Sequence, residues 1–243
     1  MKDYLLSIDN GNSSLKYKLY SASDFKTLSQ GYPLSKCIEE NNLSAKNTNV
    51  IIANVNSDIN ELKNFSCLDV KTFFKNNKFL DMPVNYTETI GVDRLVSCYY
   101  IFKKLPLKLP CLVIDAGTFL TCDLLSSKGF EGGYILPGIQ TMLKSYQNGK
   151  QLPVMKLKTA FNKVKSNQNQ FENLPHSTEE AILNGVFNMY TQFFNRFKEQ
   201  QNLKNVIITG GEASYIQTLF NGEIIDDLNL KSLLFIYQQV GLK

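Results

Sequence analysis

Two segments of this sequence repeat one short pattern, and the repeat restricts the fold more than any other feature. Each copy is an apolar run that ends in Asp-x-Gly, followed by Asn or Thr and then by a second strand-like run. The copies occupy residues 5–13 and 112–118. A strand, a glycine turn and another strand are typical of a β-hairpin. The sequence therefore predicts two similar β-hairpins.

The two hairpins lie almost half of the 243-residue chain apart, which predicts two similar halves. Residues 105–110 read Leu-Pro-Leu-Lys-Leu-Pro. Two prolines disfavour a continuing helix, so we interpret this stretch as a linker. We expect an N-terminal half at residues 1–108 and a C-terminal half at residues 109–243.

Helices are expected after each hairpin, because apolar residues recur there at helical spacing. The predicted helices cover residues 93–105, 178–200 and about 228–240. Ser177 and Glu180 have the spacing of a capping box at the start of the second helix. Residues 150–176 are polar and rich in Lys, Asn and Gln, which favours an irregular, lid-like segment. Strands mixed with helices in two halves indicate an α/β protein with a cleft.

Composition excludes several classes of protein. Hydrophobic residues make up 43% of the chain, enough for a real core, and the net charge of +4 is too small and dispersed to indicate nucleic-acid binding. No apolar stretch approaches the roughly 20 residues that span a bilayer, and the first residues do not resemble a signal peptide. Five cysteines without a CxxC pair disfavour a disulfide framework or a zinc site. We therefore expect a cytoplasmic protein without membrane or nucleic-acid partners.

The turn of the first hairpin has the residues that a phosphate site needs. Backbone N–H groups, small side chains and the absence of bulk suit phosphate oxygens. Asp9 could hold Mg²⁺ directly or through water, and Lys16 could reach a phosphate oxygen. The alternative is an ordinary Asx-type turn. The candidate ATP-binding residues here are Asp9, Asn10, Gly11, Asn12, Ser13, Ser14, Leu15 and Lys16.

The second hairpin places Asp115 and Thr118 at offsets similar to those of the first. Residues 206–212 then form an apolar run that ends in Thr-Gly-Gly-Glu, where adjacent glycines allow close approach of a flat ligand. Asp-x-Gly twice followed by Thr-Gly-Gly resembles the actin/hexokinase/Hsp70-like ATPases, and no Walker A sequence is present. The resemblance implies duplicated ribonuclease H-like α/β domains with an ATP cleft between them.

Three further blocks narrow the resemblance. They are Gly-Val-Asp-Arg at 91–94, Gly-Gly-Tyr-Ile-Leu-Pro-Gly at 132–138 and Thr-Glu-Glu-Ala-Ile-Leu-Asn-Gly at 178–185. With the three ATPase blocks, they resemble type III pantothenate kinases in content and order. The resemblance implies ATP-dependent phosphorylation of pantothenate to 4'-phosphopantothenate, the first step of coenzyme A biosynthesis. It also implies Mg²⁺, a monovalent cation (K⁺ or NH₄⁺) and a homodimer with the substrate pocket at its interface.

The same resemblance implies a role for each matched residue. Asp93 would be the general base for the pantothenate hydroxyl. Asp115 would hold the monovalent cation, and Thr118 would join the first turn in binding ATP. The residues that would line the pantothenate site are Tyr86, Gly91, Val92, Asp93, Arg94 and Thr178.

Asp93 also makes chemical sense as a base at the start of a predicted helix. The free N–H groups there favour the charged carboxylate, so we do not expect this position to raise its pKa. A weak base suffices because the transition state of phosphoryl transfer is loose and orientation matters more. The alternative for Asp93 is a plain N-terminal helix charge. Arg94 could bind the substrate carboxylate or pair with a neighbouring acid.

Two other functions fit the same scaffold. One is a nucleotide-binding regulatory protein, because transcriptional accessory factors occur in this family, although Asp93 beside both hairpins argues against an inactive enzyme. The other is a phosphohydrolase such as an exopolyphosphatase, in which Gly-x-Asp-Arg is not expected. His176, the single histidine, lies in a polar loop and is not expected to act in catalysis. The aromatic stripe at 187–197 is interpreted as core or dimer interface.

Overall fold

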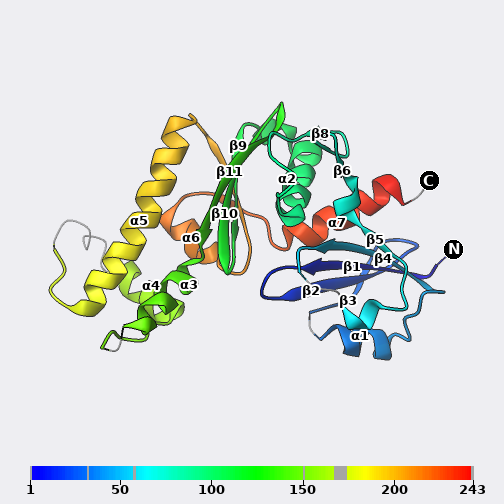
Figure 1. The fold of residues 1–243 in the computed structure, drawn as a ribbon, viewed down its shortest axis with the longest axis horizontal. Coiled ribbons are helices and arrows are strands. Elements are labelled where there is room, and N and C mark those ends of the chain that lie inside the picture. Colours follow the sequence, from blue (N-terminus) through cyan, green and yellow to red (C-terminus); the bar gives the residue numbers. More distant parts are fainter. Residues whose placement is uncertain (1, 32, 57–58, 150, 167–173, 242–243) are drawn as a thin grey trace. The chain divides into compact units, whose positions relative to one another are not determined.

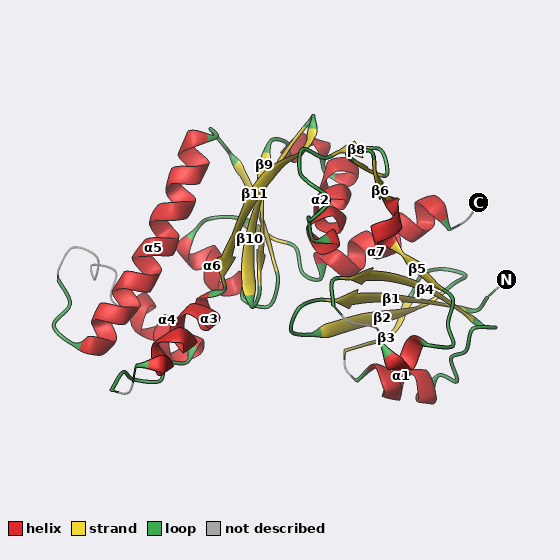
Figure 2. Ribbon diagram, in the orientation of Figure 1, coloured by secondary structure: helices red, strands yellow, loops and turns green. Residues whose placement is uncertain are grey.

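The computed structural model describes residues 2–31, 33–56, 59–149, 151–166 and 174–241. It is a mixed α/β structure with two five-stranded sheets (Figures 1 and 2). The chain forms two compact units that interleave along the sequence. Unit 1 contains Met1–Leu109, Leu125–Gly132 and Asp227–Lys243, and unit 2 contains Pro110–Leu124 and Gly133–Asp226.

The first sheet is built around the N-terminal hairpin. Its strands are β1 (Tyr4–Asn10), β2 (Leu15–Ser21), β3 (Thr27–Gly31), β4 (Thr48–Asn54) and β5 (Cys67–Asp69), in the order β3-β2-β1-β4-β5. Strand β1 is antiparallel to β2, with Asp9 opposite Lys16, and parallel to β4. The first predicted hairpin is therefore confirmed.

The second sheet repeats this arrangement. Its strands are β9 (Cys111–Ala116), β10 (Phe119–Ser126), β11 (Gly129–Pro137), β12 (Asn205–Thr209) and β13 (Glu223–Ile224), in the order β11-β10-β9-β12-β13. Strand β12 runs parallel to β9, as β4 runs parallel to β1. A parallel neighbour requires a crossover, and both sheets place that crossover after their third strand. The predicted duplication is confirmed by this shared topology.

Two helices pack together in unit 1: α2 (Val92–Lys104) and α7 (Leu228–Val240). Figure 1 shows α1 (Leu34–Glu40) on one face of the first sheet and α7 on the other. The C-terminal helix thus belongs with the N-terminal hairpin. The expected linker contains the short 3-10 helix η3 (Pro106–Lys108).

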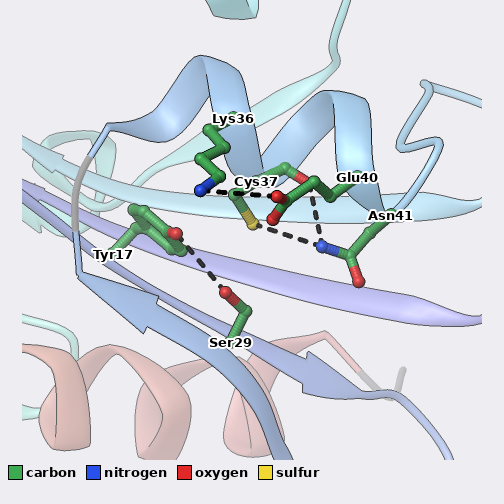
Figure 3. A network of polar contacts seen from close by, with 6 residues as sticks. All are labelled: Tyr17, Ser29, Lys36, Cys37, Glu40 and Asn41. Carbon is green, nitrogen blue, oxygen red and sulfur yellow. Dashed lines mark hydrogen bonds and ion pairs between the residues drawn. The ribbon is translucent and has the colours of Figure 1, made fainter.

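A small group of polar contacts lies on α1 and on the strands of the first sheet beside it (Figure 3). The Cys37 thiol is buried, and the Cys37 carbonyl oxygen accepts both the Asn41 side-chain amide at 2.9 Å and the Asn41 backbone N–H at 3.2 Å at the helix end. The Tyr17 and Ser29 hydroxyls lie 3.4 Å apart on the strands beneath. The Cys37 side chain acts here as a small core residue.

The helices of unit 2 gather on one side of the second sheet (Figure 2). They are α3 (Ile139–Ser145), α4 (Leu157–Ser166), α5 (Thr178–Gln200) and α6 (Ala213–Leu219). The Ser177 hydroxyl accepts the Glu180 backbone N–H at 3.3 Å, so the predicted cap and the predicted bounds of α5 are confirmed. Among the described helices, none combines the length and the apolar character needed to cross a membrane.

Helix α4 corrects one expectation. Residues 150–176 were expected to be irregular, yet Leu157, Ala160 and Phe161 are buried on one side of a helix. Their i, i+3, i+4 spacing is enough to anchor a helix even though most of its other residues are polar. Residues 150 and 167–173 of the expected lid lie outside the described residues.

The remaining elements are short. They are η1 (Asn60–Leu62), η2 (Val70–Phe73), η4 (Tyr146–Asn148) and the small sheet of β6 (Phe74–Lys75), β7 (Lys78–Phe79) and β8 (Met82–Pro83).

Candidate active site

Asp9 lies near the end of β1 in unit 1, where its side chain is half-buried. The Asn229 side-chain amide donates to Oδ2 of Asp9 at 3.3 Å. Burial, followed by the nearby charge of Asp93, raises the pKa of Asp9 to about 6, although the Asn229 hydrogen bond and the Lys16 charge act in the opposite direction. Two carboxylates in a poorly solvated place repel each other, and a cation would relieve that repulsion. The surroundings of Asp9 therefore fit a magnesium ion.

The turn after Asp9 is held by its own backbone. The Gly11 N–H donates to the Ser14 carbonyl at 3.1 Å, and the Asn10 amide donates to Oδ1 of Asn54 at 2.8 Å. Asn12, Ser13 and Ser14 remain exposed. Small exposed side chains on a tight turn leave room for phosphate oxygens.

Asp93 stands in the first turn of α2. Its Oδ1 accepts the Arg94 backbone N–H at 2.9 Å. A Cβ at Gly91, the N-cap residue, would lie 2.5 Å from the same oxygen, so any other residue there would displace the carboxylate. The glycine of the Gly-Val-Asp-Arg block thus clears the space that Asp93 occupies.

The pKa of Asp93 reflects two opposing effects. The helix start itself does not raise the pKa, as expected, but burial does. The Arg94 backbone N–H and the Arg94 charge act against this increase without overcoming it. The cost of desolvating a carboxylate here exceeds the gain from the helix terminus.

Arg94 is buried against two aromatic rings. Its guanidinium carbon lies 5.1 Å from the ring centroid of Tyr86 and 5.5 Å from that of Phe130. The two rings meet edge to face at 6.0 Å. The Asn85 N–H donates to the Phe130 carbonyl at 2.8 Å and so secures the residue next to Tyr86. The rings hold the guanidinium in place, which prepares it to bind a carboxylate.

The second hairpin is joined by a two-residue turn in unit 2. The Gly117 N–H donates to the Phe119 carbonyl at 3.1 Å, and the exposed Thr118 accepts the Gly138 N–H at its carbonyl at 2.8 Å. A Cβ at Gly138 would lie 1.9 Å from the Gly117 carbonyl oxygen. This contact explains the Pro-Gly that ends the 132–138 block.

The Thr-Gly-Gly turn after β12 packs against the same hairpin. Gly210 has a φ of +94°, and a Cβ there would lie 2.4 Å from the Ala116 carbonyl oxygen and 2.5 Å from Oδ1 of Asp115. The Glu212 N–H donates to that Ala116 oxygen at 2.8 Å, while the Glu212 carboxylate accepts the Ile139 N–H at 3.1 Å. Burial raises the pKa of Glu212. Only glycine at position 210 permits this close packing.

Comparison with known proteins assigns the family. The type III pantothenate kinase family profile matches residues 5–200. A type III pantothenate kinase of Pseudoalteromonas translucida is 30% identical over 245 residues, with 96% of each chain covered. The chain belongs to the type III pantothenate kinase family.

Solved structures show the corresponding fold. A Campylobacter jejuni protein assigned to the Baf family of transcriptional activators has a TM-score of 0.58 at 22% identity, covering 98% of this chain and all of that one. A Listeria monocytogenes protein assigned as an N-acetylmannosamine kinase has a TM-score of 0.55 at 12% identity, covering 97% of this chain and 99% of that one. At these identities the likeness concerns the fold, which is that of the actin/hexokinase-like kinases.

The structure distributes the family-matched residues over the two units. Unit 1 holds the first turn, Tyr86 and the Gly-Val-Asp-Arg block, whereas unit 2 holds Asp115, Thr118 and Thr178. Thr178 is the exposed first residue of α5. No group of three or more His, Cys, Asp or Glu side chains arranged to hold a metal occurs in the described part of the chain.

Three neighbours of these residues were missed from the sequence. Phe130 stacks on Arg94, Asn229 contacts Asp9, and Ser97 donates its hydroxyl proton to Oδ1 of Asn229. Ser97 had a faint signal, since a serine four positions after Asp93 lies on the same side of the helix. Phe130 and Asn229 had none, because only packing brings them to this place.

Proposed function

We propose that this protein uses ATP to phosphorylate the primary hydroxyl of pantothenate, giving ADP and 4'-phosphopantothenate. The observation that carries the proposal is the start of α2, where Asp93 stands beside an Arg94 guanidinium that packs against two aromatic rings. A proton acceptor next to a fixed cation suits a substrate that has both a hydroxyl and a carboxylate. Family membership names that substrate.

In the proposed reaction the substrate hydroxyl oxygen bonds to the γ-phosphorus as the bond from that phosphorus to ADP breaks. The hydroxyl proton passes to the Asp93 carboxylate. Burial raises the pKa of Asp93, which makes it a better proton acceptor than an ordinary aspartate. Arg94 holds the substrate carboxylate and so orients the hydroxyl, together with Tyr86 and Thr178. Orientation is the larger contribution, since the transition state is loose.

The ATP-binding residues in this proposal are those that match the family's ATP-binding motifs. Residues 9–16 would bind phosphate groups with backbone N–H groups, hydroxyls and Lys16, and Thr118 would contribute a further hydroxyl. Asp9 would hold Mg²⁺, which offsets the negative charge of the phosphates. The exposed first turn and the raised pKa of Asp9 support this assignment.

We further propose that Asp115 supports binding of a monovalent cation, K⁺ or NH₄⁺. Asp115 is the penultimate residue of β9, as Asp9 is of β1, and a second cation would offset charge that Mg²⁺ leaves on the phosphates. We expect Asp115→Asn to raise the potassium concentration for half-maximal activity while changing the magnesium requirement little. The measurement is a potassium titration with sodium as the comparison and Asp226→Asn, an exposed aspartate in unit 2, as the control. Equal activity in sodium and potassium would contradict the assignment.

The proposal includes a cytoplasmic homodimer. All five cysteines, which lie among the described residues, are free thiols, as suits a reducing compartment. Tyr134, Ile135 and Met189 expose apolar surface in unit 2, as a protein contact would require.

The direct test is mass spectrometry of the products after purified protein has been incubated with MgATP, potassium and pantothenate. We expect phosphopantothenate, together with ADP release that depends on pantothenate. Release of ADP or phosphate without dependence on pantothenate would favour a phosphohydrolase instead. Nucleotide binding with no turnover would favour a regulatory protein.

A further inference from the structure

A buried polar chain links the Asp9 carboxylate to the helix that carries Asp93. Asn229, in the first turn of α7, donates from Nδ2 to Oδ2 of Asp9 at 3.3 Å and accepts the Ser97 hydroxyl at Oδ1. Asn229 and Ser97 are 8% and 3% exposed, so water has little access to either side chain. All of these residues belong to unit 1.

The two hydrogen bonds set the orientation of the Asn229 amide. Ser97 donates to the amide oxygen, which turns the amide nitrogen toward Asp9. The opposite orientation would set the amide oxygen against the Asp9 carboxylate, with two acceptors facing each other and no proton between them. Ser97 therefore ensures that Asp9 meets a donor.

The position of Ser97 connects this chain of hydrogen bonds to the helix of the candidate base. Ser97 follows Asp93 by four residues on α2, so the two side chains leave the same side of the helix about one turn apart. The chain from Asp9 through Asn229 to Ser97 thus ties strand β1 to the helix of the candidate base. A carboxylate has two oxygens, and the contact at Oδ2 leaves Oδ1 for a metal ion or its water.

We propose that Asn229 is a positioning residue, which holds one oxygen of Asp9 so that the other faces Mg²⁺ bound to ATP, and that Ser97 fixes its amide. The inference rests on the proposed function, since Asp9 has a metal to bind only in a nucleotide-dependent enzyme. Asn229 touches neither nucleotide nor substrate in this proposal and acts through Asp9.

The test compares Asn229→Leu, which removes the donor but keeps a side chain branched at Cγ, with Ser97→Ala, which leaves the amide without its orienting partner. Binding of a non-hydrolysable ATP analogue is measured by calorimetry with and without Mg²⁺, and without pantothenate. We expect Asn229→Leu to weaken Mg²⁺-dependent binding about 10-fold to 100-fold, as the loss of a hydrogen bond to a charged group does. Binding without Mg²⁺ should change little. Ser97→Ala should shift Mg²⁺-dependent binding in the same direction by less.

Turnover supplies a second readout. The kcat of Asn229→Leu should fall by a similar factor while the KM for pantothenate stays within about two-fold, because substrate contacts are untouched. The double variant should match Asn229→Leu alone in kcat, since Ser97 acts only through the amide. It should also recover stability, because no buried serine hydroxyl is left without its acceptor.

Ser232→Ala is the matched control. Ser232 is a buried serine on the same helix that donates to the Leu228 carbonyl, so its loss tests the packing of α7 without touching Asp9. A folded Asn229→Leu variant with unchanged Mg²⁺-dependent binding would overturn the inference. Equal weakening with and without Mg²⁺ would do the same, since it indicates a purely structural role. If the wild-type protein binds the ATP analogue in the presence of Mg²⁺ but makes no phosphopantothenate, the result would contradict the proposed function and not the role of Asn229.

Discussion

At the scale of single residues, burial and the backbone have opposite effects on the pKa of Asp93. The Arg94 N–H accounts for one hydrogen bond to its Oδ1, and the Arg94 charge also favours ionisation, yet burial raises the pKa. The result is a carboxylate that is oriented by the helix start and made more basic by its surroundings. Both properties suit a proton acceptor at neutral pH.

Asp93→Asn should fold normally and lose turnover. The amide keeps the shape of the side chain and removes the proton acceptor, and general bases typically contribute about 10²-fold to 10⁴-fold. The measurement is kcat in the presence of saturating MgATP, with circular dichroism as the check on folding. Glu88→Gln, an exposed neighbour in unit 1, is the control. A rate near that of wild type would place the base elsewhere.

Asp9 should make the stability of the nucleotide-free protein depend on pH. Its pKa rises from 3.8 to about 6 on folding, so between these values the folded state binds more protons than the unfolded state. Stability must therefore fall as the pH rises through this range. At about 1.4 kcal/mol for each tenfold change in the ionisation constant, the loss at neutral pH is ~3 kcal/mol.

Asp9→Asn tests this directly, because the amide has no charge to bury. In magnesium-free buffer we expect the variant to have a higher Tm than wild type at pH 7 to 8 and an equal one near pH 4. With MgATP added, the variant should have no kinase activity, whereas wild type should be active. The comparison is a series of thermal melts across this pH range, with Asp3→Asn, an exposed carboxylate of unit 1, as the control. A variant less stable than wild type at pH 7 would show that Asp9 makes a net stabilising contribution.

At the scale of elements, glycine turns decide how closely strands and loops approach. The turn after β12 rests on the end of β9, where a Cβ at Gly210 would enter the space of the Ala116 carbonyl. In helix α4, three buried apolar residues anchor a helix within a mostly polar stretch. In both cases a few positions determine the local structure.

Gly210→Ala should destabilise the protein by ~1–3 kcal/mol, since a positive φ and a close carbonyl both oppose a side chain. Gly211→Ala is the matched control, because a Cβ added at this next residue would meet no atom within 4 Å and its φ is not positive. The effect of the control should stay within about 0.5 kcal/mol. Urea denaturation measures both. Equal effects of the two substitutions would contradict the packing argument.

At the scale of the whole molecule, unit 2 has several large apolar side chains exposed on its surface. Tyr134 is 53% exposed and Ile135 is 57% exposed on β11, and the Tyr134 ring packs on Phe193 and Phe197 of α5. Met189, on the same helix, is 47% exposed. Exposed aromatic and aliphatic side chains of this kind are typical of protein interfaces.

We expect the wild-type protein to sediment as a dimer and Ile135→Arg to sediment as a monomer with reduced activity. The arginine would place an unpaired charge in the apolar contact, which is costly once water is excluded. Leu107→Arg is the control, because Leu107 is 96% exposed and belongs to unit 1 instead of unit 2. Analytical ultracentrifugation gives the mass of each variant. A wild-type monomer that is fully active would contradict the proposed dimer.

The local pattern of the sequence determined the two hairpins, the start of α2 and the capped helix α5. These features depend on residues close together in the chain: an apolar run, a turn glycine, and Ser177 three residues before Glu180. The order of the six blocks was enough to indicate the family and hence the fold. The matched residues Asp9, Asp93 and Arg94 follow from the same order, because each stands at the end or start of a predictable element.

Only the tertiary structure decided what surrounds those residues. It brought Asn229 to Asp9 and Phe130 to Arg94, and it assigned the C-terminal helix to the unit of the N-terminal hairpin. It also raised the pKa of Asp93, which the sequence pattern did not anticipate. Contacts between residues far apart in the chain, and the desolvation that follows from them, depend on how whole elements pack. That packing cannot be predicted from the spacing of residues along the chain.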